Sequence, residues 1–122
     1  MDARLIKKAI SEAQKSKERH KIGAVVFKGS RIISSAFNEL RYAKKLARKY
    51  KKFEFSLHAE TKAILRARKD LRNHSILVVR VNKQGEFLLA KPCKYCMAYL
   101  EYVGIKTIYY STKEGICTLN LN

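Results

Sequence analysis

The segment from residue 75 to residue 110, SILVVRVNKQGEFLLAKPCKYCMAYLEYVGIKTIYY, decides the fold that the sequence predicts. Its first part, 75–81, is a nearly unbroken apolar run that is typical of a buried strand. Pro92 can take the first position of a helix that ends at Gly104, and a second apolar run, 105–110, follows directly. A strand, a helix and a strand in succession predict a right-handed crossover, so the two strands should pair in parallel.

The upstream segments add a helix, a hairpin and a second helix. Apolar residues at helical spacing predict the first helix over 3–17, with Asp2 as its cap. Two short apolar runs, 22–27 and 32–37, flank a glycine-containing turn and are typical of a hairpin. A narrow apolar face predicts the second helix over 58–69.

These elements predict one domain over residues 1–122. The fold class is α/β: a three-layer α/β/α sandwich around a mixed sheet of about five strands, the last two main strands being parallel. A chain of 122 residues that is 47% hydrophobic can bury one core. Its apolar runs are far shorter than the roughly 20 residues that cross a bilayer, and the start lacks a signal-peptide segment. We therefore expect a soluble, intracellular, cytoplasmic protein without a membrane partner.

Two short motifs carry candidate metal chemistry, HAE at 58–60 and PCKYC at 92–96, and each begins a predicted helix. His58, Cys93 and Cys96 are good zinc ligands, and helix N-termini favour the deprotonated thiols. Three protein ligands leave the fourth tetrahedral position for water, as in a catalytic Zn²⁺ site. A metal-bound water needs a neighbouring group that takes its proton, and Glu60 is placed for that work.

HAE followed by PCxxC resembles the signature of the cytidine and deoxycytidylate deaminase superfamily, and the order of predicted elements is similar along nearly the whole chain. The resemblance implies that Glu60 carries a proton from the zinc water to the ring nitrogen and the departing ammonia. Asn38, which ends the second predicted strand, resembles the family's substrate-contacting asparagine. The backbone amide of Ala59 resembles a group that binds the base carbonyl. Asn38 is alternatively a turn residue that only ends its strand.

A closed structural zinc site is the alternative use of the same three ligands. Cys117, His20 or His74 would then supply the fourth ligand. Glu60 argues against this alternative, because a structural zinc needs no proton carrier. We expect His20 and His74 at the surface or as caps, and Cys117 as a buried apolar thiol.

The charge points to a polyanionic partner: 27 Lys and Arg against 10 Asp and Glu give a net charge of +17. Segment 41–52 has seven basic residues in twelve and no acid, with Tyr42, Leu46 and Tyr50 at helical spacing. Cations beside aromatic faces are typical of a groove for single-stranded nucleic acid. Alternatively, the apolar stripe packs into the core and the lysines are only solvated. The candidate nucleic-acid contacts are Arg41, Lys44, Lys45, Arg48 and Lys49.

Several functions fit these observations. The first is deamination of cytosine to uracil in single-stranded DNA or RNA, favoured by the charge. The second is deamination of free deoxycytidylate, favoured by the compact domain without added recognition elements. A tRNA adenosine deaminase is a variant of the first, because the motifs do not distinguish the two ring amines. The last is a non-catalytic, zinc-stabilised nucleic-acid-binding module, against which Glu60 argues.

Overall fold

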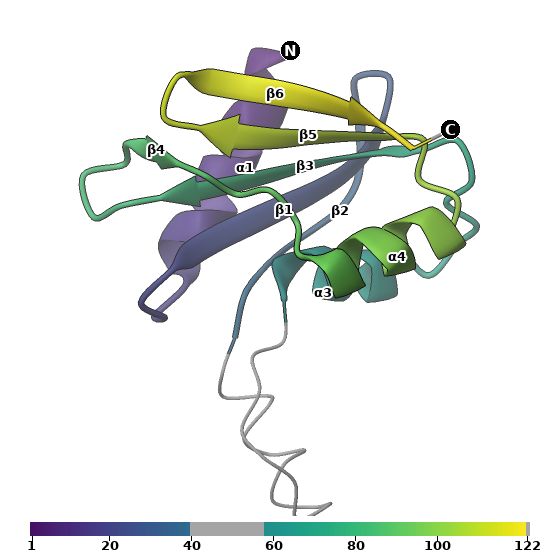
Figure 1. Ribbon diagram of the computed structural model, residues 1–122, viewed down its shortest axis with the longest axis horizontal. Helices are drawn as coiled ribbons and strands as arrows, with labels where there is room; N and C mark the ends of the chain where they lie inside the picture. The colour runs from purple at the N-terminus through teal and green to yellow at the C-terminus, as the bar shows by residue number, and fades with distance from the viewer. Residues whose placement is uncertain (40–57, 122) are drawn as a thin grey trace, which may run out of the picture.

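The computed structural model of the chain describes residues 1–39 and 58–121. There, helix α1 lies across one face of a sheet, and α3 and α4 lie together on the other (Figure 1). The elements in chain order are α1 (Ala3–Lys15), β1 (Lys21–Lys28), β2 (Arg31–Phe37), α3 (Ala59–Ala67), β3 (Ser75–Val81), β4 (Phe87–Leu88), α4 (Lys94–Tyr102), β5 (Thr107–Thr112) and β6 (Gly115–Asn120).

Strand β3 is the centre of the sheet. The strand order is β2-β1-β3-β5-β6, and the short β4 pairs with β3 outside this path. β3 and β5 are parallel, with Ser75 opposite Thr107 and Val78 opposite Tyr110. The other pairs are antiparallel. The predicted mixed sheet and its parallel pair across α4 are therefore confirmed.

Alternate residues of the central strands face opposite helix layers. Val25 and Leu77 pack in one apolar cluster with side chains of α1. Their neighbours Val26 and Ile76 pack in a second cluster with side chains of α3 and α4. Because successive strand residues point to opposite faces, both faces of the sheet are apolar and both must be covered. The three-layer arrangement follows from this pattern.

Helix α1 is fixed at its start and along its length. The Asp2 carboxylate accepts a hydrogen bond of 2.8 Å from the backbone N–H of Arg4, so the predicted cap is present. The helix lies so close to β1 that a Cβ at Gly23 would be 2.2 Å from the Ala9 carbonyl oxygen and 2.6 Å from the Ala13 backbone nitrogen. Both contacts are with backbone atoms, so only glycine fits at this position.

Helix α4 begins two residues later than its predicted start. Cys93 is its N-cap and Lys94 its first residue, so Pro92 lies just before the helix. This later start makes Cys93, a candidate metal ligand, the N-cap of α4.

Strand β5 begins at Thr107, two residues after the predicted start. The backbone N–H groups of Ile105 and Lys106 are already used: one donates to the last turn of α4 and the other to the loop before β3. Pairing with β3 therefore starts only after them.

Two side chains lie elsewhere than expected. Cys117 was expected to be buried but is exposed, because β6 is an edge strand. His74, expected at the surface or as a cap, is buried, and its Nδ1 lies 3.0 Å from the carbonyl oxygen of Arg72. In the described part of the chain, His74 and Cys117 do not belong to the group of candidate metal ligands.

The basic segment 41–52 lies outside the described residues. Among the residues described, no helix has the length and apolar character needed to cross a membrane.

Candidate metal centre and active site

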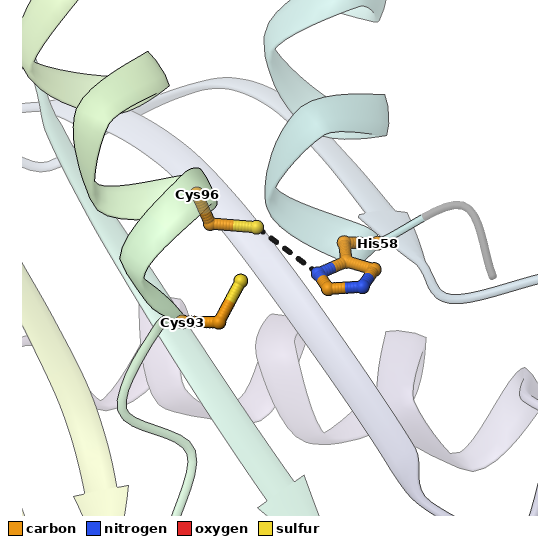
Figure 2. Close-up of side chains that lie close together, drawn as sticks. All are labelled: His58, Cys93 and Cys96. Atoms are coloured by element: carbon orange, nitrogen blue, oxygen red, sulfur yellow. Dashed lines mark hydrogen bonds between the residues drawn. The ribbon is translucent and has the colours of Figure 1, made fainter. Parts of the chain in front are cut away.

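Two helix starts bring the candidate metal ligands together. His58 is the N-cap of α3 and Cys93 the N-cap of α4, and neither side chain makes a capping hydrogen bond. Cys96 follows in the first turn of α4, on the same helix face as Cys93 because the two are three residues apart. All three side chains point into the space between the two helices (Figure 2).

The geometry of this group suits zinc. One imidazole nitrogen and two sulfurs lie within 4.8 Å of one another, and His58 Nδ1 is 3.0 Å from Cys96 Sγ (Figure 2). Ligand atoms around a tetrahedral zinc are about 3.5 to 4 Å apart, given Zn–S and Zn–N bonds of about 2.3 and 2.0 Å. Cys96 is buried, whereas His58 and Cys93 are exposed, so the fourth position can open to solvent.

The electrostatics of the group also call for a cation. Burial raises the pKa of the Cys96 thiol far above its usual value, and the Glu60 carboxylate beside it adds to the rise. Burial likewise raises the pKa of Glu60, which is 5% exposed. Two thiolates and a carboxylate would repel one another in this position, and a divalent cation among them would offset that repulsion.

A cavity of about 350 Å³ opens beside the metal-ligand group. Its lining residues come from both helix starts, from β1 and β3, and from the segments before β1, after β2 and after β4: His20, Ile22, Asn38, His58, Glu60, Val78, Arg80, Leu89, Ala90, Lys91 and Cys93. A volume of this size can hold a small molecule such as one nucleotide. The buried Glu60 carboxyl therefore lines the same cavity as two of the three candidate ligands.

Asn38 has a structural role and also faces the cavity. Its Oδ1 accepts a hydrogen bond of 3.1 Å from the Ile22 backbone N–H, and its Nδ2 donates one of 2.7 Å to the His20 carbonyl. These bonds fasten the end of β2 to the start of β1. The amide retains a second N–H and Asn38 lines the cavity, so a substrate contact by this residue stays a prediction.

The remaining predicted site residues divide into two groups. Ala59 is buried as the first residue of α3, where a backbone N–H has no partner within the helix. The five candidate nucleic-acid contacts, Arg41, Lys44, Lys45, Arg48 and Lys49, lie outside the described residues.

Three ionisable cavity residues, His20, Arg80 and Lys91, were not assigned to the substrate site from the sequence. A signal existed for Arg80, since it is the only charged residue in the apolar run 75–81. Charged side chains in a buried strand are uncommon without a partner or a function.

A three-layer fold with one imidazole, two thiols and a buried carboxylate at two adjacent helix starts defines the class of zinc-dependent deaminases. The chain matches the model of the cytidine and deoxycytidylate deaminase zinc-binding region over residues 1–112. It belongs to this family, and its cofactor is zinc.

Solved structures of family members have the same fold. The dCMP deaminase of cyanophage S-TIM5 is 20% identical, with a TM-score of 0.62 over 90% of this chain and 84% of its own. The cytidine deaminase of Mycobacterium leprae is 21% identical, with a TM-score of 0.59 over 92% and 87%. A structure from a study of A-to-I editing by tRNA:A34 deaminases is 23% identical, with a TM-score of 0.59 over 88% and 73%. No curated protein matches the chain.

Proposed function

We propose that residues 1–122 form one deaminase domain that hydrolytically converts cytosine to uracil. The observation that carries this proposal is the position of Glu60, a buried carboxyl that lines the cavity next to the candidate zinc ligands. A structural zinc site does not require a carboxyl group that carries protons. The non-catalytic alternative is correspondingly disfavoured.

The residues of the site have distinct roles in this proposal. His58 Nδ1 and the sulfurs of Cys93 and Cys96 hold the zinc, which when bound lowers the pKa of a coordinated water. Glu60 would accept a proton from the attacking water and deliver it to the ring nitrogen and the leaving amine. The backbone N–H of Ala59, which has no partner within α3, would donate to the base carbonyl.

Two substrate forms have support. The net charge of +17 and the basic segment 41–52 support cytosine in single-stranded DNA or RNA as the first candidate. The cavity of about 350 Å³ supports free deoxycytidylate as the second. The tRNA:A34 deaminase among the similar structures keeps adenosine in tRNA as a variant to test.

A side-by-side assay tests the proposal. The zinc-loaded protein is given deoxycytidylate, cytidylate, a single-stranded oligonucleotide with one cytosine, and a tRNA anticodon stem-loop, and products are identified by mass. We expect a gain of about 1 Da at a cytosine, since NH₂ is replaced by OH. Absence of product from every substrate at full zinc occupancy would refute the deaminase proposal.

Salt dependence separates the two cytosine substrates. Binding of an oligonucleotide should weaken with salt, with a log-log slope of about −0.7 per phosphate contacted. Changing Lys44, Lys45, Arg48 and Lys49 together to glutamine should flatten the slope and lower oligonucleotide turnover. The matched control changes four exposed lysines elsewhere, Lys28, Lys69, Lys83 and Lys113. An equal effect of both quadruple variants would leave segment 41–52 without a special role.

A further inference from the structure

The cavity wall carries an arginine and a histidine that the deamination chemistry does not use. Arg80 and His20 both line the cavity, and Arg80 Nη2 is 2.8 Å from His20 Nδ1. Because the guanidinium can only donate, His20 Nδ1 accepts and the remaining proton of the neutral ring is on Nε2. The Arg80 Nε is buried and has no hydrogen-bond partner among residues 1–39 and 58–121. The Arg80 Nε–H and the His20 Nε2–H therefore remain available as hydrogen-bond donors.

The backbone holds Arg80 firmly in place. Arg80 lies opposite Ile22 of β1 and Leu88 of β4, so β3 is paired on both sides at this point. Its backbone N–H donates a hydrogen bond of 2.9 Å to Ser111 Oγ, and that hydroxyl donates one of 2.7 Å to the Leu88 carbonyl. Side chains on paired strands are better positioned than those on loops, which suits a residue that must orient a ligand.

No acid of residues 1–39 or 58–121 forms an ion pair with Arg80; the ion pairs found there join other residues. Glu60, the acid that lines the cavity, lies beside the candidate metal ligands and contacts Cys96. Lys91, from the segment between β4 and α4, adds another cation to the lining. An unpaired buried guanidinium N–H is costly, so a ligand anion is the natural acceptor.

We propose that Arg80 and His20 bind the phosphate of the substrate nucleotide, so that the enzyme prefers a phosphorylated substrate to a free nucleoside. This inference rests on the proposed function and names its substrate class more closely. The Nε–H and an Nη–H of arginine form a fork that matches two oxygens of a phosphate, and His20 Nε2–H can donate to the third. A nucleoside leaves these donors unpaired, which a site built for hydrogen bonding penalises strongly. The phosphate is either that of a free nucleotide or one of a polynucleotide backbone.

Equilibrium binding of the product pair deoxyuridylate and deoxyuridine to the zinc-loaded protein tests this without turnover. We expect wild type to bind deoxyuridylate about 10- to 100-fold more tightly, the range for charge-assisted hydrogen bonds. Arg80→Gln should remove most of that preference by weakening deoxyuridylate binding alone. Arg31→Gln is the matched control, because Arg31 is exposed at the turn between β1 and β2, at the opposite end of these strands from His20. It should keep the full preference.

Further variants keep the test decisive if Arg80→Gln fails to fold. Arg80→Lys keeps the charge but loses the Nε–H donor, so it should retain part of the preference; His20→Ala should lose about 3- to 10-fold. Equal binding of the two ligands by wild type would overturn the inference. An undiminished preference for deoxyuridylate would also overturn it, if it is found in an Arg80 or His20 variant with the melting temperature of the wild type.

Turnover of deoxycytidylate and of the cytosine oligonucleotide then identifies the source of the phosphate. A loss by Arg80→Gln on deoxycytidylate alone supports a free nucleotide, and a loss on the oligonucleotide supports a backbone phosphate. A loss on neither contradicts the inference. Failure of the proposed function looks different, since the wild-type protein would then form no uracil from any substrate.

Discussion

Replacing Glu60 with glutamine separates the chemistry of the site from its structure. Glu60 is 5% exposed and lies in the first turn of α3. Glutamine has nearly the same shape and volume, so the packing around position 60 should change little. It cannot accept and release a proton, so the proposed proton transfers should be lost.

The size of the effect can be bounded. Proton transfer by a positioned side chain contributes about 10²- to 10⁴-fold to a rate. At about 1.36 kcal/mol for each factor of ten, the barrier should rise by about 3 to 5.5 kcal/mol. Zinc content should stay at one ion per chain, because His58, Cys93 and Cys96 are all retained. The melting temperature should stay within a few degrees of wild type.

The assay measures product by mass, zinc by elemental analysis and stability by thermal unfolding on the same preparation. Glu101→Gln is the control, since Glu101 is an exposed carboxylate on the neighbouring helix α4 and its loss changes the net charge equally. The control should retain wild-type turnover. Glu60→Gln activity within a few-fold of wild type, at full zinc occupancy, would refute the assignment of Glu60 as proton carrier.

Three further changes test the ligands, the cavity and the fold. Replacing Cys93 and Cys96 together with alanine should reduce zinc from one ion per chain to nearly none and lower the melting temperature, whereas Cys117→Ala should retain the metal; a double variant with full zinc would contradict the ligand set. Asn38→Ala removes two hydrogen bonds at a buried position and should cost about 1 to 3 kcal/mol of unfolding free energy, measured by urea titration, together with slower turnover. Gly23→Ala forces a methyl group against the backbone of α1 and should cost about 3 kcal/mol in the same titration; a loss below about 0.5 kcal/mol would contradict the close approach.

The sequence predicts best where local pattern and chemistry coincide. β3 has the bounds that its apolar run predicts, 75–81, because a strand buried on both faces leaves an unbroken apolar signal. The HAE and PCKYC motifs contain all three candidate metal ligands, because each of these residues lies at a helix start that the flanking residues also indicate. The parallel pair followed from the order of elements alone.

What the sequence did not predict depends on contacts between distant residues. His20 and Arg80 meet only because β1 and β3 pair with Ile22 opposite residue 80, a register that neither segment encodes by itself. The exposure of Cys117 depends on β6 being the last strand of the sheet. His74 is buried in the segment between α3 and β3, where the sequence has no periodic pattern that could indicate burial.

The uncapped starts of α3 and α4 couple metal binding to local unfolding. A capping side chain typically stabilises a helix by about 1 kcal/mol, and neither His58 nor Cys93 makes such a bond. Zinc bound by these side chains would stabilise the first turn of α3 and the first turn of α4 together. On chelation, amide hydrogen exchange should accelerate together in the first turns of α3 and α4, while α1, capped by Asp2, keeps its protection. Bound zinc would therefore hold together two helices that make few contacts with each other.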